Sequence, residues 1–325
     1  MTEWIVELPD GYRAVTPSMD DIPRATAFFN LVEISEWGMP DFDENEVEEE
    51  WADLDLSKSV VLVESESGEV VASMTLIESR GVTWEAFGYV HPDHQGNGLG
   101  RWIVDWSERT AHSRDDQTRD GYKVELLNYI STVNTAAQQL LGARGYEVAK
   151  VFRRMRLDMA ERPEPVVWPN GYDLRMFVRD KDERPFFAAL ESAFAEHWAA
   201  APRTFEDWTK HWLSRDADTD LWVQLMHDRR VVGISCGRVM SGAGWIGYVG
   251  VIPEYRRRGL AKLILQESFG RFWDKGIQQV DLGVDSNNRQ SAIDLYLGAG
   301  MYESHSYETN RKVLRDGLDW REDED

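Results

Sequence analysis

A repeat of about 160 residues constrains the fold of this chain more than any other feature. Gly11-Tyr12-Arg13 is followed 160 positions later by Gly171-Tyr172-Asp173, and Val90-His91-Pro92 is followed 161 positions later by Val251-Ile252-Pro253. A spacing that stays constant over so many residues indicates a duplicated domain. Each copy is long enough to bury a hydrophobic core of its own.

The 325 residues therefore divide into two domains on either side of a proline-rich segment. Residues 161–170 have the sequence ERPEPVVWPN, whose three prolines exclude a continuous helix and favour an extended linker. We expect a first domain over residues 1–160 and a second domain over residues 171–325.

Both halves show the same order of strand and helix patterns. In the first half we expect a strand near residues 12–16, a helix over 20–37, and a hairpin whose turn is Ser67-Gly68-Glu69. The strand TWEAFGYV then leads through a glycine-rich turn into the helical pattern WIVDWSERTAHS, and the second half repeats this order. The pattern predicts an α/β fold of two tandem domains, each with a mixed central sheet flanked by helices.

Charge and composition exclude several classes of partner. Acidic residues exceed basic residues by 58 − 36 = 22, so the surface repels phosphate backbones and anionic headgroups, and we expect no nucleic acid or membrane partner. The sequence shows no signal-peptide pattern and no apolar run long enough to span a bilayer. The lone cysteine, Cys236, and histidines without metal-binding spacing predict a cytoplasmic protein that holds no metal.

A short motif recurs where the third strand of each half leads into a helix. It reads Gln95-Gly96-Asn97-Gly98-Leu99-Gly100 in the first half and Arg256-Arg257-Arg258-Gly259-Leu260-Ala261 in the second. Such a turn exposes backbone N–H groups beside the positive end of a helix dipole, which suits a pyrophosphate. The alternative is a tight turn that binds nothing. Neither copy has the spacing of a Walker loop or of a dinucleotide-binding fingerprint.

These motifs resemble those of the Gcn5-related N-acetyltransferases (GNAT family). The family's V-x-P, Q/R-x-x-G-x-G/A and N…A-x-x-L-Y…G signatures correspond here to Val251-Ile252-Pro253, the turn that begins at Arg256, and the segment from Asn288 through Leu295-Tyr296 to Gly300. The resemblance extends over nearly the whole chain as a tandem arrangement. It implies two GNAT-like domains, acetyl-CoA as the cofactor, and an amine acceptor that is a small molecule.

The resemblance also implies which residues bind acetyl-CoA. In the family, one strand binds the pantetheine arm and the following turn binds the pyrophosphate. In the second half these roles fall on Val249, Val251, Arg256, Arg257, Arg258, Gly259, Leu260, Ala261 and Lys262, with Asn288 ordering the surroundings. The matching positions of the first half are Val90, Gln95, Gly96, Asn97, Gly98, Leu99 and Gly100.

The two halves differ at the position of the family's general acid. Tyr296 carries a phenol that can protonate the departing thiolate, whereas Leu141 occupies the matching position of the first half. We therefore expect the second half to be catalytic and the first half to be non-catalytic. The alternative for Tyr296 is a tyrosine that is simply packed on the sheet.

The general base and the acceptor pocket are less defined by the sequence. Asp285 is a candidate base, as is His197, which together with Trp198 is expected near the acceptor. Asp285 also suits a loop cap, His197 also suits simple packing, and a water chain is a third route for the proton. The carboxylate-rich stretch 41–55 is interpreted as a solvated helix face.

The leading hypothesis is an acetyl-CoA-dependent N-acetyltransferase that transfers the acetyl group directly within a ternary complex. One alternative is a non-catalytic acyl-CoA-binding protein with a regulatory or scaffold role. Another is a protein or peptide N-acetyltransferase, since an acidic surface suits a basic peptide.

Overall fold

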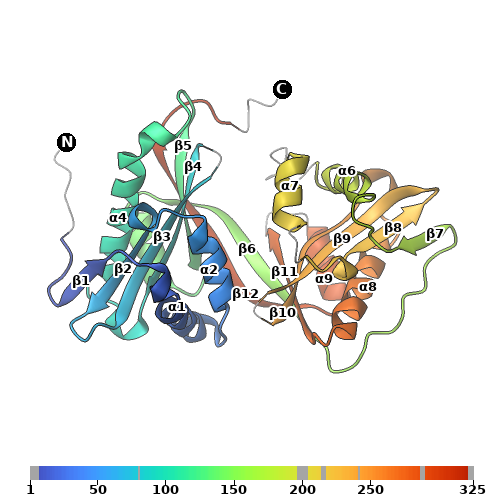
Figure 1. Cartoon of the computed structure of the whole chain (residues 1–325), viewed down its shortest axis with the longest axis horizontal. Coiled ribbons are helices and arrows are strands. Elements are labelled where there is room, and N and C mark those ends of the chain that lie inside the picture. The colour runs from blue at the N-terminus through green and yellow to red at the C-terminus, as the bar shows by residue number, and fades with distance from the viewer. Residues whose placement is uncertain are drawn as a thin grey trace. The chain divides into compact units, whose positions relative to one another are not determined.

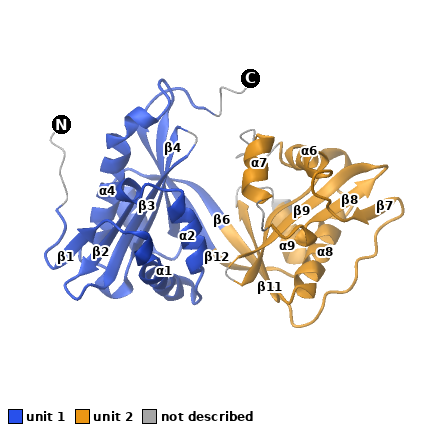
Figure 2. Ribbon diagram, viewed as in Figure 1, with its two compact units in different colours: residues 1–152, 306–325 blue, residues 153–305 orange. Residues whose placement is uncertain are grey.

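The computed structural model describes residues 7–79, 81–195, 204–213, 217–240, 242–285 and 290–320. The chain forms two compact units, shown in blue and orange in Figure 2. We call residues 1–152 together with 306–325 the first unit, and residues 153–305 the second unit. His197, Trp198 and Asn288 lie outside the described residues.

Strands and helices follow one another in the same order in both halves of the chain (Figure 1). The first unit contains β1 (Tyr12–Val15), α1 (Ile22–Trp37), α2 (Glu44–Ala52), α3 (Leu56–Ser59), β2 (Val60–Ser65), β3 (Val70–Ser79), β4 (Thr83–Val90), α4 (Leu99–Ser113), β5 (Val124–Ser131) and α5 (Thr135–Ala143). The second contains β7 (Tyr172–Arg175), α6 (Glu183–Phe194), α7 (Phe205–Trp212), β8 (Val223–His227), β9 (Arg230–Met240), β10 (Ala243–Val251), α8 (Leu260–Asp274), β11 (Gln279–Asp285) and α9 (Gln290–Gly298). β6 (Glu147–Asp158) and β12 (Tyr302–Arg315) begin in one unit and end in the other.

Each unit builds a mixed sheet. The strand order is β1-β2-β3-β4-β5-β12-β6 in the first unit and β7-β8-β9-β10-β11-β6-β12 in the second. The β4–β5 and β10–β11 pairs are parallel, whereas β1–β2, β2–β3 and β3–β4 are antiparallel, as are β7–β8, β8–β9 and β9–β10. The predicted fold class, tandem α/β domains with mixed sheets flanked by helices, is confirmed.

Side-chain alternation along β4 places helices on both faces of the first sheet. A Cβ on Gly88 would meet Ile103 of α4, 3.2 Å away. The next residue, Tyr89, points to the other face and packs its ring 5.1 Å from that of Phe29 on α1. The core of this unit therefore lies in two layers, one under α4 and one under α1 and α2.

The second sheet is covered in the same way. A Cβ on Gly244 would meet Phe272 of α8 at 2.6 Å, whereas a Cβ on Gly250 would meet Ala193 of α6 at 2.9 Å. Hence α8 covers one face, and α6 covers the other. Trp208 and Trp222 are each only 1% exposed, so these two tryptophans belong to the core and do not line a pocket.

The compact units differ from the predicted domain boundaries in two segments. Residues 153–160 belong to the second unit, although they were expected in the first domain, and residues 306–325 belong to the first unit, although they were expected in the second. The reason is strand pairing: β12 pairs antiparallel with β5, and β6 lies next to β11. Each sheet is thus completed by a strand from the other half of the chain.

A buried carboxylate holds each of these returning strands. In the second unit Asp281 of β11 is completely buried, and its carboxylate lies 2.6 Å from the Arg156 guanidinium on β6. In the first unit Glu125 of β5 is 2% exposed and lies 3.5 Å from the Arg311 guanidinium on β12. The Asp281–Arg156 pair, in which both side chains are buried, is costly to break, because the remaining charge is left without its partner.

The linker and the acidic stretch can be compared with their predicted structures. Residues 161–170 form neither helix nor strand. In the acidic stretch, α2 buries Val47 and Trp51 and exposes Glu44, Glu48 and Glu49, as expected of a solvated face, whereas Glu46 is partly buried and burial raises the pKa of Glu50. Among the described residues, no helix is both long enough and apolar enough to cross a membrane.

Candidate active site

The two central strands of the second unit separate shortly after they begin. β10 and β11 pair only at Gly244–Val280 and Trp245–Asp281, although both strands are described over their full length. The register of β10 with β9 shifts between Ile246 and Tyr248, which is a β-bulge at Gly247. Bulges bend a strand and end its pairing. From the bulge to Val251, the edge of β10 towards β11 is therefore open.

The opened strand leads into the turn that the sequence identified. Arg257 and Gly259 both have positive φ, 60° and 75°, and α8 begins at Leu260. In the described part of the chain, the backbone N–H groups from Arg257 to Lys262 have no hydrogen-bond partner. Gly259 offers no capping side chain, so these N–H groups and the helix dipole present partial positive charge to an anion.

The arginines of this turn have different environments. The Arg256 guanidinium donates to the carbonyl oxygens of Val251 at 3.3 Å and Ala193 at 3.1 Å. Arg258 donates to the Tyr172 hydroxyl at 3.1 Å and lies 4.9 Å from the centre of the Tyr255 ring. Arg256 thus connects the turn to β10 and α6, and Arg258 connects it to β7. Arg257 and Lys262 are exposed.

This site fits a coenzyme A thioester. A Cβ placed on Gly259 would meet no atom within 4 Å, so the space beside this residue is open. Anions bind readily at uncapped helix N-termini, so the turn suits a diphosphate. The four steps along the strand from Val251 back to Gly247 span about 13 Å at about 3.3 Å per residue, a course along which a pantetheine arm can bind.

Tyr296 lies on α9 in the core of the second unit. It is 9% exposed, and its hydroxyl has no hydrogen-bond partner among the described residues. Burial raises the pKa of the Tyr296 phenol to about 12, so the group is protonated at neutral pH. A protonated O–H in an apolar environment can donate a hydrogen bond to negative charge that develops beside it.

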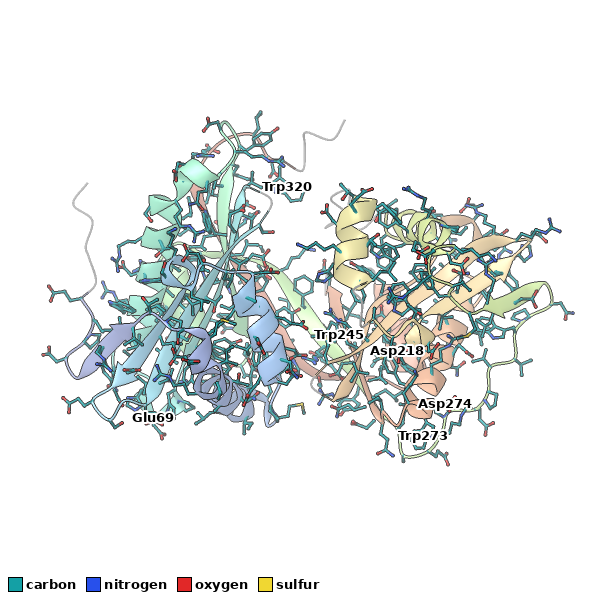
Figure 3. The ribbon with its side chains drawn as sticks, viewed as in Figure 1. Glu69, Asp218, Trp245, Trp273, Asp274 and Trp320 are labelled. Carbon is teal, nitrogen blue, oxygen red and sulfur yellow. The ribbon has the colours of Figure 1, made fainter. Side chains whose placement is uncertain are left out.

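Asp285 ends β11 on the face that α6 and α7 cover. Side chains alternate along a strand, so Asp285 shares a face with Gly283, and a Cβ on Gly283 would lie 3.6 Å from the Trp245 ring. Trp245, labelled in Figure 3, is on the corresponding face of β10. Asp285 is 5% exposed.

Several aromatic side chains lie near the bulge. A Cβ on Gly247 would lie within 2.6 Å of the Trp212 indole, so Trp212 lies directly across the bulge. The Trp212 ring is 5.0 Å from the ring of Tyr248, which is 5.5 Å from the ring of Phe194. Only the strand register reveals Gly247 as an extra residue, because the sequence offset of 161 residues aligns it with Ala86 of the first half.

The first unit keeps the turn but differs in the strands. Gly96 and Gly98 have positive φ, 80° and 85°, at the positions of Arg257 and Gly259, and α4 begins at Leu99. Asn97 donates to the Tyr12 hydroxyl at 3.1 Å, as Arg258 does to Tyr172. The remaining predicted positions of this turn, Val90, Gln95 and Gly100, lie beside it, and a Cβ on Gly100 would be 3.9 Å from Val90.

In this unit β4 and β5 pair over five residues, from Thr83–Glu125 to Phe87–Tyr129, and β4 has no bulge against β3.

The two units also differ in the residue at the position of the general acid. The carbonyl of Leu141 accepts from the Tyr146 N–H at 3.0 Å, and that of Tyr296 accepts from the Met301 N–H at 3.1 Å. Leu141 therefore holds the same position at the end of α5 as Tyr296 holds at the end of α9. Leu141 is 1% exposed.

The fold and the site define an acyltransferase of the GNAT class, and comparison with known proteins agrees. The model of the acetyltransferase (GNAT) family matches residues 24–146 and 163–301, so the chain belongs to this family. The crystal structure of a GCN5-related N-acetyltransferase from Sphaerobacter thermophilus matches with a TM-score of 0.88 and 34% identity, over 97% of this chain and 99% of that one.

Other relatives are more distant. The mycothiol acetyltransferase of Renibacterium salmoninarum is 27% identical over 226 residues, which cover 65% of this chain and 62% of that protein. The chain thus spans less than two thirds of that relative's length. A tandem GNAT protein from the clavulanic acid biosynthesis pathway matches with a TM-score of 0.72 at 14% identity, over 94% of this chain and 99% of that one, a likeness of fold alone.

Proposed function

We propose that the second unit transfers an acetyl group from acetyl-CoA directly to the amine of a small molecule. The observation that carries this proposal is the opened edge of β10, which begins at the Gly247 bulge and ends at the unpaired N–H groups of the α8 N-terminus. The mycothiol acetyltransferases among the relatives support a small-molecule acceptor.

The N–H groups from Arg257 to Lys262 would hold the diphosphate, and the exposed Arg257 and Lys262 side chains would add positive charge. The backbone of Val249 and Val251 would bind the pantetheine arm, since the edge of β10 towards β11 is open there. Acetyl-CoA, when bound, supplies an acetyl group activated as a thioester. Asn288, outside the described residues, remains part of the proposed surroundings.

Tyr296 would act as the general acid. When the amine nitrogen bonds to the acetyl carbon, the carbon–sulfur bond breaks and the sulfur needs a proton. The buried phenol keeps its proton at neutral pH, because burial raises its pKa to about 12. It has no competing hydrogen-bond partner among the described residues, so its O–H is available to the departing sulfur.

The proton lost by the amine would go to Asp285 or to a water chain. Asp285 is a carboxylate on the face of the sheet that α6 covers, at the end of the strand that separates from β10. His197 and Trp198 remain acceptor-side candidates outside the described residues. The only cysteine, Cys236, is completely buried in β9, which argues against a covalent acyl-enzyme on this thiol and favours direct transfer.

Calorimetry with acetyl-CoA, followed by a panel of amines in an assay of thiol release, tests the proposal. We expect acetyl-CoA to bind, and at least one amine, with the precursor of mycothiol included, to release thiol faster than buffer does. Binding without thiol release from any amine would contradict the proposal and favour a non-catalytic acyl-CoA-binding protein. Thiol release only with peptides would favour a protein N-acetyltransferase.

A further inference from the structure

A positive charge lies beside the opened strand of the second unit. Arg238 of β9 is the register partner of Trp245 on β10, just before the bulge. Its neighbour Gly237 faces α8, because a Cβ there would lie 2.8 Å from Phe272. Alternation therefore places Arg238 on the opposite face, which α6 and α7 cover.

Trp212 connects this arginine to the site. The Arg238 guanidinium carbon is 4.9 Å from the centre of the Trp212 ring. The same ring lies across Gly247, where β10 separates from β11. The Trp212 ring therefore lies between Arg238 and Gly247. Gly247 is the end of the open edge at which the thioester would lie under the proposed function.

Charged groups of both signs lie on this face, which also carries the Asp285 carboxylate. Burial and the positive charge of Arg238 lower the pKa of His211 on α7. Across the sheet, the Arg154 guanidinium lies 5.1 Å from the centre of the Trp245 ring. Arg154 and Arg156 together face one buried carboxylate, that of Asp281.

The matching face of the first unit has no arginine at this position. Ile77 pairs with Glu85 where Arg238 pairs with Trp245. Tyr89 of β4 lies on that face, and its pKa is raised well above the ordinary value by burial and by the carboxylates of Glu33, Glu50, Asp41 and Glu36 on or near α1 and α2. The arginine beside the bulge is therefore specific to the second unit.

We propose that the acceptor of the second unit carries an anionic group, a carboxylate or a phosphate, which binds Arg238 while its amine lies at the Gly247 bulge. This inference rests on the proposed function and specifies its substrate class. A guanidinium near the site disfavours an acceptor whose only charge is an ammonium. It binds carboxylates and phosphates through paired N–H donors.

Matched pairs of acceptors test the inference. Phenylalanine against phenylalaninamide tests a carboxylate, and glucosamine 6-phosphate against glucosamine tests a phosphate. For the wild-type protein we expect kcat/KM to be about tenfold or more higher for the anionic member of at least one pair. In Arg238→Met this preference should disappear, because KM rises for the anionic member and much less for the neutral member. Arg238→Lys should retain part of the preference.

Arg162→Met is the matched control, because Arg162 forms an exposed ion pair with Asp274, which is labelled in Figure 3, at 2.8 Å. This variant should keep the wild-type preference. Turnover of the neutral amines by Arg238→Met shows that the variant is folded.

Equal kcat/KM values for both members of each pair would overturn the inference and leave the proposed function intact. An equal loss on anionic and neutral acceptors in Arg238→Met would also overturn it. No thiol release from any acceptor would instead contradict the proposed function itself, and with it this inference.

Discussion

The two units share a turn and differ in what surrounds it. Both have positive φ at the same two positions before a helix that no side chain caps. In the second unit a bulge opens the strands after two paired residues, whereas in the first unit the strands pair over five. Tyr296 in one unit corresponds to Leu141 in the other. A backbone binding geometry has thus been kept while the chemical groups beside it changed.

The sharpest test of this difference is the tyrosine. Tyr296→Phe removes only the hydroxyl, and since general acid catalysis contributes about 10²–10⁴-fold, we expect kcat to fall about 100-fold or more. Acetyl-CoA affinity should stay within about threefold. The matched variant Leu141→Met should leave kcat unchanged. Full turnover by Tyr296→Phe with normal acetyl-CoA binding would remove the tyrosine from the mechanism.

The turn glycines test which unit binds the reacting coenzyme. Gly259→Val places a branched side chain at φ 75° in front of the N–H groups, so we expect the Kd of acetyl-CoA in the catalytic unit to rise about 10–100-fold. The matched variant Gly98→Val changes the first unit, and thiol release should continue at the wild-type rate. A loss of turnover in Gly98→Val alone would reverse the assignment of the two units.

The bulge can be tested through stability. Gly247→Ala would force the Trp212 indole away from β10, and overpacking of this kind lowers the free energy of unfolding by about 1–3 kcal/mol. Gly283→Ala on the next strand is the control, because its Cβ would lie at an ordinary 3.6 Å from Trp245. Chemical denaturation measures both. Equal stability of Gly247→Ala and wild type would show that Trp212 does not pack against the bulge.

Acid should affect the second unit through His305 on β12. Burial, with the positive charges of Arg154 and Arg156, lowers the pKa of this imidazole to about 4, against 6.5 ordinarily. The folded state thus holds His305 neutral, so its contribution to stability is present above pH 6.5 and is lost as the pH falls towards 4. Because His305 is partly exposed to solvent, which weakens the effect, we expect the free energy of unfolding to fall by about 1 kcal/mol.

Urea denaturation between pH 7 and pH 4.5 measures this effect. His305→Gln cannot titrate and should show a flatter dependence of unfolding free energy on pH. Identical pH dependence in the variant and the wild type would contradict the assignment.

The smallest effect is expected at Arg257. It is not glycine yet has a φ of 60°, whereas its counterpart in the first unit is Gly96. Arg257→Gly should raise the free energy of unfolding by about 1 kcal/mol, because the strain is relieved. It should also weaken acetyl-CoA binding a few-fold, since one exposed positive charge is lost. Tighter binding by Arg257→Gly would show that this side chain does not contact the coenzyme.

Local patterns in the sequence predicted the local structure. The offset of 160 residues predicted the two copies, and the Gly259 turn and the Tyr296 helix lie where their motifs indicated. Strand pairing between distant segments was not predictable in this way. That β12 pairs with β5 depends on which strand satisfies an open sheet edge, and hydrophobic alternation within a strand does not encode its partner.

The same limit applies to the acceptor face. Arg238, Trp212 and Gly247 come from β9, α7 and β10, and only the fold brings them together. The extra glycine of the second copy is visible only in the strand register, and its meaning depends on the indole that lies across it.

The most direct test of the account is the response of backbone amides to acetyl-CoA, measured by NMR on the isotope-labelled full chain. The account predicts that the largest changes in amide chemical shift occur between Arg257 and Lys262, with smaller changes along Val249 and Val251. If acetyl-CoA changes amide chemical shifts only elsewhere in the chain, the account is contradicted.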